Sequence, residues 1–179
     1  MSIEIEKKYR LTEPDRESLK VALTEAGAEF AGREFEVNTI YTSEALRSNS
    51  SILRVRRIGG RTMLTYKRRV GSDLGIKRQI EYETEVKDAE AIEAIIAEIG
   101  LEPALVYEKY RETWRFRSVE VVIDELPFGL FAEIEGSITA IKEAEMLLDI
   151  EHLSSEHETY PNLTAIHGKK TDGVTESRF

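Results

Sequence analysis

The chain has 179 residues, of which 41% are hydrophobic and 33% charged, and its formal net charge at pH 7 is -9. This composition is typical of one globular domain, and the negative charge argues against a broad nucleic-acid-binding surface. The sequence has no cysteine, which excludes disulfides and thiolate metal sites, and its three histidines argue against a histidine-based zinc site. Any bound metal would therefore be held by carboxylates, which favours Mg²⁺ or Mn²⁺.

The chain carries no pattern typical of a targeting or membrane segment. Its first residues, MSIEIEKKYR, contain no apolar core, and no later apolar run is long enough to cross a bilayer. We therefore expect a cytoplasmic protein with no membrane partner. No repeat or linker divides the sequence, so we expect a single domain over residues 1–179, with a loosely ordered polar tail from about residue 168.

Strand and helix patterns follow one another along the chain. Alternating residues predict strands at 3–9, 35–41, 51–58, 62–69, 77–86, 106–116, 119–124 and 130–135, with a flexible loop at 71–75. Helices are predicted after the capping residues Thr12, Asp88 and Ser137. The apolar stripes of the second and third helices are expected to face the core: Ile92, Ile95, Ile96 and Ile99, then Ile138, Ile141, Met146, Leu147 and Ile150.

The first strand has an unusual polar face. Because side chains alternate along a strand, Glu4, Glu6 and Lys8 lie on one face and the isoleucines between them on the other. Two carboxylates and an ammonium group on one face are suited to a metal ion and an anion held side by side.

The same pattern of charges returns in six later strands. The charged positions are Arg54 and Arg56, Lys67, Glu81 and Glu83, Lys109 and Arg111, Asp124, and Glu133 and Glu135. One interpretation is an antiparallel sheet with one solvated face. A second interpretation is a closed barrel with the charges inside, because the charges are sorted by sign from strand to strand and about eight strands suffice to close a sheet.

A closed barrel would place opposite charges in a confined space. Carboxylates ~4 Å apart repel by about 4 kcal/mol at an effective dielectric constant near 20, so they would require a cation. Clustered lysines and arginines would require a polyanion, and a polyphosphate that carries a divalent metal satisfies both demands. We therefore expect an α+β fold, in which a closed antiparallel β-barrel of about eight strands forms a polar tunnel with helices packed outside.

The ordered set of motifs resembles the CYTH superfamily, the triphosphate tunnel metalloenzymes. Glu4-x-Glu6-x-Lys8 is similar to the ExExK signature of that family. The remaining motifs follow in the family's order: Leu53-Arg54-Val55-Arg56, Leu64-Thr65-Tyr66-Lys67, Glu81-Tyr82-Glu83, Lys109-Tyr110-Arg111, Val122-Ile123-Asp124 and Phe131-Ala132-Glu133-Ile134-Glu135-Gly136. The resemblance extends from residue 3 to about residue 136.

This resemblance implies a role for each matching position. Metal ligands would be Glu4, Glu6, Glu133 and Glu135, with Asp124 close by, and together with Lys8 the four glutamates would form the catalytic set. The residues that would bind the triphosphate oxygens are Lys8, Arg54, Arg56, Lys67, Lys109 and Arg111. Glu81 and Glu83 would either join the metal site or hold the tunnel arginines by ion pairs.

Two features depart from the family pattern. An arginine often precedes the central acidic pair, but here Arg78 is out of phase with Glu81 and Gln79 takes the in-phase position. The family also supplies a basic residue from its C-terminal segment, for which Lys169 and Lys170 are candidates, although a solvated tail also accounts for them.

Three functions agree with the sequence. The first is a metal-dependent triphosphatase that acts on inorganic tripolyphosphate or a small organic triphosphate. The second is a class IV adenylyl cyclase, which converts ATP to cyclic AMP and pyrophosphate, and the third is a module that binds polyphosphate or nucleotide without turnover. The expected partner is a small triphosphate and not a nucleic acid, and the oligomeric state stays open, with a homodimer among the alternatives.

Overall fold

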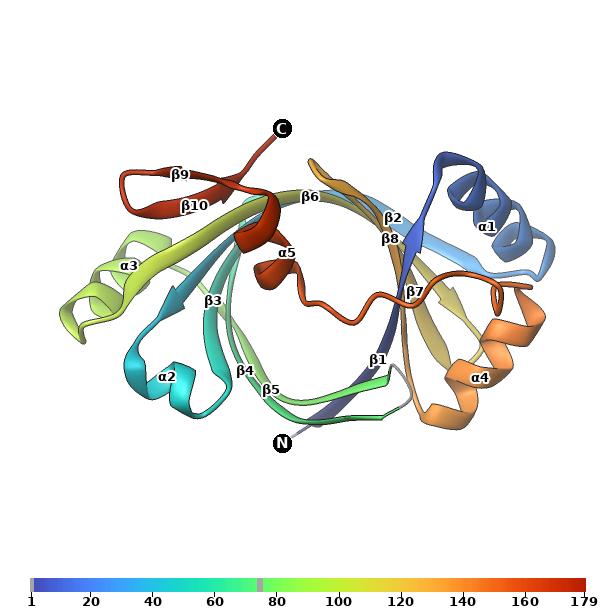
Figure 1. Cartoon of the computed structure of the whole chain (residues 1–179), viewed down its shortest axis with the longest axis horizontal. Coiled ribbons are helices and arrows are strands. Elements are labelled where there is room, and N and C mark those ends of the chain that lie inside the picture. The colour runs from blue at the N-terminus through green and yellow to red at the C-terminus, as the bar shows by residue number, and fades with distance from the viewer. Residues whose placement is uncertain (1, 74–75) are drawn as a thin grey trace.

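The strands of the chain form one closed ring. The computed structural model describes residues 2–73 and 76–179, and its barrel strands pair in the order β2-β3-β4-β5-β1-β8-β7-β6. A further pairing of β2 with β6 closes the ring (Figure 1). The strands are β1 (Ser2–Leu11), β2 (Glu29–Thr42), β3 (Ser51–Ile58), β4 (Arg61–Asp73), β5 (Ile76–Val86), β6 (Glu102–Phe116), β7 (Val119–Leu126) and β8 (Gly129–Glu135). All neighbours in the ring are antiparallel, which confirms the predicted barrel.

Two irregularities bend β2 where it closes the barrel. Its register with β6 shifts between Phe30 and Gly32, and again between Ile40 and Tyr41. Gly32 has a φ of +143°, a backbone conformation that side chains other than glycine rarely adopt. Bulges of this kind add the local twist and curvature that a long strand needs to close a ring.

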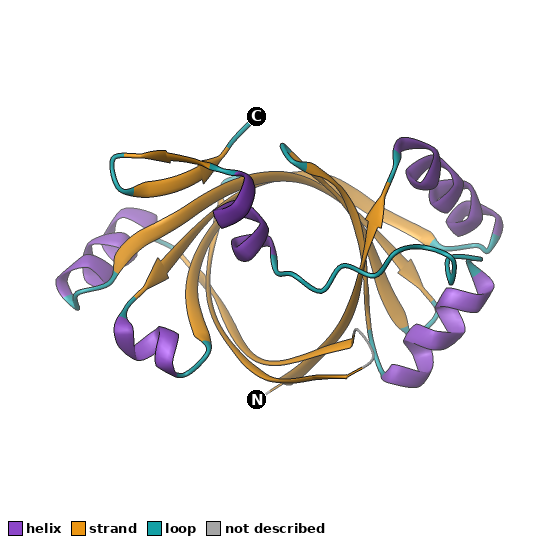
Figure 2. Ribbon diagram, in the orientation of Figure 1, coloured by secondary structure: helices purple, strands orange, loops and turns teal. Residues whose placement is uncertain are grey.

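Helices lie outside the ring (Figure 2), and apolar residues of the strands pack against them. Helix α1 (Glu13–Glu25) begins at a capping box formed by Thr12 and Asp15, and α4 (Ile138–Leu147) begins at Ser137. The largest hydrophobic core lies between these two helices and the barrel wall, and it contains Tyr9, Leu23, Ile134 and Ile141. The polar faces of the strands therefore line the interior of the barrel.

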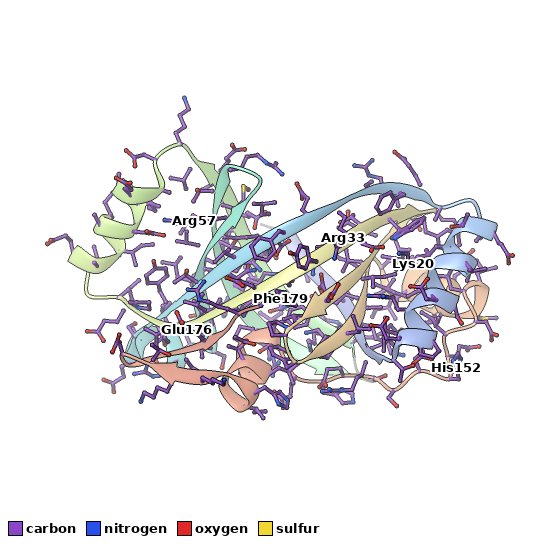
Figure 3. The ribbon with its side chains drawn as sticks, turned by 90° about the horizontal axis from the view of Figure 1, so that it is seen from above. Lys20, Arg33, Arg57, His152, Glu176 and Phe179 are labelled. Carbon is purple, nitrogen blue, oxygen red and sulfur yellow. The ribbon has the colours of Figure 1, made fainter. Side chains whose placement is uncertain are left out.

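Helix α3 (Ala89–Glu98) covers another part of the wall, and the short α2 (Glu44–Ser48) precedes β3. Ile96 of α3 packs against Val55 of β3. Arg57 also belongs to the outer face of β3, where its guanidinium donates to Glu93 of α3 at 2.8 Å (Figure 3). Among the helices that the structure describes, none combines the length and the apolar character needed to span a bilayer.

The predicted apolar stripes of α3 and α4 are wrong in part. Ile95 and Ile99 are 54% and 66% exposed, whereas Ile96 is buried. In the third predicted helix, Met146 and Leu147 are also exposed, whereas Ile141 and Ile150 are buried as predicted. The reason is geometric: each helix touches the curved barrel wall along a narrow line, so only the central row of its apolar residues is covered.

The predicted loose tail is also wrong, because the C-terminal segment is part of the fold. It forms α5 (Tyr160–His167), β9 (Lys169–Thr171) and β10 (Val174–Ser177). Strand β10 pairs in parallel with β6, and Lys169 and Lys170 lie exposed in β9. Of the loop predicted at 71–75, residues 71–73 belong to β4. Residues 74 and 75 lie outside the described part of the chain.

Candidate active site

The inward-facing side chains surround a cavity of about 810 Å³ inside the barrel. Its wall contains all the predicted site residues except Asp124: Glu4, Glu6, Lys8, Arg54, Arg56, Lys67, Glu81, Glu83, Lys109, Arg111, Glu133 and Glu135. Strand alternation thus brings residues from six strands of the ring to one cavity, although they are far apart in sequence. Their roles there remain predictions.

Asp124 lies behind this wall, where it holds three cavity side chains. Its Oδ2 accepts hydrogen bonds from Lys109 Nζ at 3.2 Å, Arg111 Nη2 at 2.6 Å and Tyr160 Oη at 2.8 Å. Its Oδ1 accepts a further bond from Arg111 Nε at 2.7 Å. Both oxygens of this fully buried residue are therefore occupied by neighbouring side chains, and its predicted place near the metal stays a prediction.

Two more carboxylates neutralise the same group of cations. Glu36 Oε2 lies 3.5 Å from both Lys109 Nζ and Arg56 Nε. Glu133 accepts from Arg111 Nη2 at 2.7 Å and lies 3.3 Å from Lys8 Nζ. Burial alone would raise the pKa of these two carboxyls, but the surrounding ammonium and guanidinium groups hold both pKa values well below the usual range.

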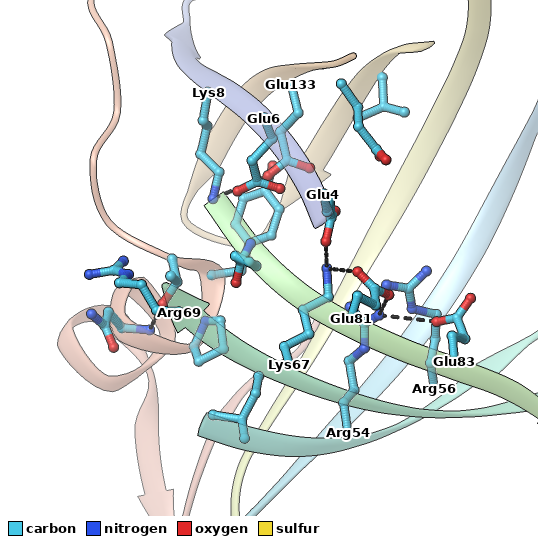
Figure 4. A pocket seen from close by; sticks show the side chains of 18 of the residues that line it. Glu4, Glu6, Lys8, Arg54, Arg56, Lys67, Arg69, Glu81, Glu83 and Glu133 are labelled. Carbon is cyan, nitrogen blue, oxygen red and sulfur yellow. Dashed lines mark hydrogen bonds and ion pairs between the residues drawn. The ribbon is translucent and has the colours of Figure 1, made fainter. Parts of the chain in front are cut away.

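A second group of charges centres on Lys67 (Figure 4). Its ammonium lies 2.7 Å from a carboxylate oxygen of Glu4 and 2.7 Å from one of Glu81. Arg54 Nη2 lies 3.4 Å from Glu83 and 3.9 Å from Glu81. One predicted role of Glu81 and Glu83 was to hold the tunnel arginines by ion pairs, and both residues make such pairs with Arg54.

The cations of the cavity are not fully compensated. Arg54 Nε is buried and has no hydrogen-bond partner within the described ranges. Burial and the neighbouring Arg111 charge lower the pKa of Lys109 to about 8. Since an unpaired buried donor and crowded positive charges are both unfavourable, this region is suited to an anion with several acceptor oxygens.

Three carboxylates of the cavity are, in contrast, not fully neutralised by neighbouring cations. Burial and the Glu81 carboxylate raise the pKa of Glu4 to about 7. Burial and the Glu4 charge raise the pKa of Glu135 to about 7, and burial followed by Glu133 raises the pKa of Glu6. Glu6 and Glu135 are also direct neighbours across the β1–β8 register.

These three carboxylates fit a divalent cation by their chemistry, since hard ions such as Mg²⁺ and Mn²⁺ prefer carboxylate oxygens. In the described part of the chain, no three acidic or imidazole side chains already converge as a metal centre would require. One reason is that a Glu4 oxygen is bonded to Lys67. Metal binding would therefore require this ion pair to rearrange.

We expect the stability of the metal-free protein to fall as the pH rises from about 5 to 8. Glu4 and Glu135 have folded-state pKa values of about 7, above the ordinary value of 4.5, so the folded state binds protons more tightly than the unfolded state. Their contribution is complete below pH 4.5 and is lost as the pH rises through 7. Mg²⁺ should therefore raise the melting temperature more at pH 8 than at pH 5.5. A thermal shift that does not grow with pH would contradict this assignment of the metal ligands.

Sequence reasoning missed several residues of the site. Glu36 and Asn38 alternate within the strand predicted at 35–41, so their spacing places them on one face but does not show that this face is buried. Lys77 is in phase with Gln79 and Glu81 on β5, and it is buried whereas Arg78 is exposed. No local pattern marks Tyr160, whose ring lies 3.6 Å from Lys8 Nζ, because its position depends on how α5 packs against the barrel.

Fold and site together define a class of protein: a closed β-barrel whose tunnel carries paired cations and carboxylates. Residues 2–162 match the CYTH domain, and the chain therefore belongs to the CYTH family of triphosphate tunnel proteins. Members of this family are triphosphate-processing enzymes that typically use divalent metals. Among curated proteins, none matches the sequence.

Several solved structures share the fold. PH1012 from Pyrococcus horikoshii OT3 is 24% identical with a TM-score of 0.77, and the match covers 89% of this chain and 98% of that one. A proposed adenylate cyclase from Vibrio parahaemolyticus is 20% identical with a TM-score of 0.72, covering 92% and 98%. HpAC1 from Hippeastrum, described as a proposed adenylyl cyclase with a dominant triphosphatase activity, is 19% identical with a TM-score of 0.67, covering 96% and 98%.

Proposed function

We propose that this protein is a divalent-metal-dependent triphosphatase that hydrolyses inorganic tripolyphosphate or a small organic triphosphate inside the barrel. The observation that carries the proposal is the excess of buried donors in one cavity, above all the unpartnered Arg54 Nε among the described residues. A linear triphosphate offers many oxygens along a chain, which matches cations contributed by β1, β3, β4 and β6. The dominant triphosphatase activity of HpAC1 supports the choice of reaction.

Each group of residues would have a distinct task. Arg54, Arg56 and Arg111 would bind the phosphate oxygens and neutralise the charge that develops on the leaving phosphate. Asp124 would keep Lys109 and Arg111 directed into the cavity by the bonds that it accepts.

The acidic side of the tunnel would complete the site. The glutamates Glu4, Glu6 and Glu135 would hold Mg²⁺ or Mn²⁺, with Glu133 adjacent. When bound, such an ion supplies Lewis-acid polarisation of the phosphoryl oxygens. A free carboxylate oxygen at this position would also orient the attacking water toward the terminal phosphorus.

Adenylyl cyclase activity is the second candidate. A cavity of about 810 Å³ is large enough for a nucleotide as well as for a bare triphosphate chain. The structural likeness to the proposed adenylate cyclase of Vibrio parahaemolyticus agrees with this alternative. A binding module without turnover is the third candidate, but such a module would need only the cations and would leave the three underneutralised carboxylates without a purpose.

Product analysis tests the proposal. The protein is incubated with tripolyphosphate, ATP or thiamine triphosphate, with Mg²⁺ or Mn²⁺, and phosphate, pyrophosphate and cyclic AMP are measured separately. We expect phosphate to be released from at least one of the three, and no cyclic AMP. Formation of cyclic AMP and pyrophosphate from ATP would show that the protein is an adenylyl cyclase and would contradict the triphosphatase proposal. Binding of a triphosphate without any product would support the third candidate, a binding module without turnover.

A further inference from the structure

Two neighbouring surfaces on the outside of the barrel have no partner within the described chain. The first is the outer face of β4 and β5, which form the lower arc of the ring in Figure 1, where none of the described helices lies outside them. Because Lys67, Arg69 and Gln79 line the cavity, the residues that alternate with them point outward. On the uncovered part of this face, which we call the sheet face, these are Tyr66, Arg68 and Val70 of β4, and Arg78, Ile80 and Tyr82 of β5.

The sheet face is aromatic and positively charged. Tyr82 is 51% exposed, and its ring lies 6.3 Å from the ring of Tyr66, its cross-strand neighbour. Val70, on the same face, is 47% exposed. Arg68 and Arg78 are both exposed, and within the described ranges neither forms an ion pair. The sheet face therefore carries only positive charge, although the net charge of the whole chain is -9.

The second surface is one flank of α3. Ile95 of the helix and Ile99 at its C-cap are one turn apart, and both are exposed. The adjacent row of the helix packs on β3 through Ile96, while Glu93 pairs with Arg57 on the other flank. The helix itself contains three glutamates and neither lysine nor arginine. This surface is therefore apolar along one flank and negatively charged as a whole.

The helix and the sheet face lie side by side. Leu64 of β4 and Leu53 of β3 both pack against the apolar cluster that Ile96 of α3 joins. Leu53 is also the cross-strand neighbour of Tyr66, so the sheet face begins where the cover provided by α3 ends. A cationic, aromatic surface therefore borders an acidic, apolar helix on the same side of the molecule.

We propose that this chain forms a symmetric dimer in which α3 of each copy packs on the sheet face of the other. A twofold axis that runs along the strands, between the two surfaces, makes the two contacts equivalent. Each contact brings the exposed isoleucines of α3 onto Tyr66 and Tyr82, and the glutamates of α3 toward the two exposed arginines. Aromatic residues and arginine are the types enriched at protein interfaces. The contact lies outside the barrel, so it does not depend on what the cavity binds.

Charge complementarity identifies the occupant of these surfaces as a second copy of the chain. A nucleic acid would be attracted by the arginines of the sheet face but repelled by the glutamates of the adjacent helix. An acidic peptide on the sheet face would leave Ile95 and Ile99 in contact with water. A second copy covers both surfaces at once and brings the charges of each opposite those of the other sign.

Two charge variants and their mixture test this dimer by sedimentation velocity of the full chain over a range of concentrations. Ile95→Lys places a positive charge opposite the arginines of the partner copy, and Tyr82→Glu places a negative charge opposite its α3 glutamates. Each variant alone should weaken dimerisation by about 100-fold or more, because each substitution occurs twice in a symmetric interface. When the two variants are mixed, they should form a heterodimer. One contact is then unaltered, and the other joins the introduced lysine to the introduced glutamate.

Matched controls place the same new charges on other exposed apolar residues. Met146→Lys on α4 and Val21→Glu on α1 change side chains that are 67% and 55% exposed, and both variants should dimerise like the wild type. Circular dichroism and the melting temperature show whether each variant is folded. Arg68→Glu removes no apolar contact from the sheet face, and it replaces Tyr82→Glu in the same mixing experiment if that variant is unstable.

Several results would overturn the dimer. One is a wild-type protein that sediments as a monomer at every concentration, and another is a dimer that neither variant weakens. Folded variants that are monomeric alone and stay monomeric when mixed would exclude the reciprocal packing of α3 on the sheet face. A monomeric wild-type protein that binds a labelled single-stranded RNA or an acidic peptide, and loses this binding on Tyr82→Glu, would assign the sheet face to that partner instead.

Discussion

Replacement of Asp124 by alanine is expected to reduce the free energy of unfolding by about 3–5 kcal/mol, the usual consequence of removing one partner from a buried ion pair. Asp124 is fully buried, and its two oxygens accept hydrogen bonds from Lys109, Arg111 and Tyr160. Without it, the buried Lys109 and the half-buried Arg111 lose their shared acceptor, and the hydroxyl of Tyr160 loses its only acceptor in the described ranges. Urea denaturation monitored by circular dichroism measures the change.

An exposed ion pair provides the matched control for this prediction. Glu143 pairs with Arg117 on the surface, where the side chains are 55% and 57% exposed, so Glu143→Ala should change stability by about 0–1 kcal/mol. Asp124→Asn keeps the shape and part of the hydrogen bonding, and it provides a folded variant if the alanine protein does not fold. An Asp124→Ala protein as stable as the Glu143→Ala protein would show that the tunnel cations do not depend on this carboxylate.

The second large effect is expected from Glu135→Gln, which should abolish most metal-dependent turnover without destabilising the protein. Loss of even an outer partner of a metal site costs about 10–100-fold in affinity or activity, so kcat should fall by about 100-fold or more. Glu135 has no ion pair among the described residues, and partial burial together with Glu4 raises its pKa to about 7. A neutral amide removes this repulsion, so at pH 8 without metal the variant should melt at the same temperature as the wild type or higher.

Opposite responses of activity and stability distinguish a metal ligand from a structural residue. Glu98→Gln, on the exposed outer surface of α3, is the matched control and should change neither kcat nor the melting temperature. A Glu135→Gln protein with full metal-dependent activity would remove Glu135 from the metal site. A strong loss of stability would instead show that this carboxylate holds the barrel together.

The barrel and most of its charged lining were predictable because both follow from local alternation. Glu4, Glu6 and Lys8 must share a face in any strand, and the sorting of charges by strand indicated that this face turns inward. Glu36 and Asn38 obey the same rule, but a short stretch with one acid and one amide is also typical of a solvated strand. Their burial becomes evident only from the β2–β6 pairing that closes the ring.

Long-range packing decided the features that sequence reasoning missed or misjudged. The polar sequence after Tyr160 gives no sign that the start of α5 lines the cavity or that β10 pairs with β6. Likewise, the periodicity of α3 identifies an apolar stripe but not how much of it the curved wall covers, so Ile95 and Ile99 stay exposed. Lys77 was overlooked because its acceptor, the Glu158 carbonyl, is 81 residues away in sequence.

The most direct measurement of the central claim, that the barrel interior binds a triphosphate together with a divalent metal, is a crystal structure with tripolyphosphate and Mn²⁺. Anomalous scattering would locate the metal independently of the phosphates. We predict a phosphate chain inside the barrel, within hydrogen-bond distance of Arg54 and Arg111, and Mn²⁺ bound by oxygens of Glu6 and Glu135. Phosphate or Mn²⁺ found only on the outer surface, with the cavity filled by water, would contradict the claim.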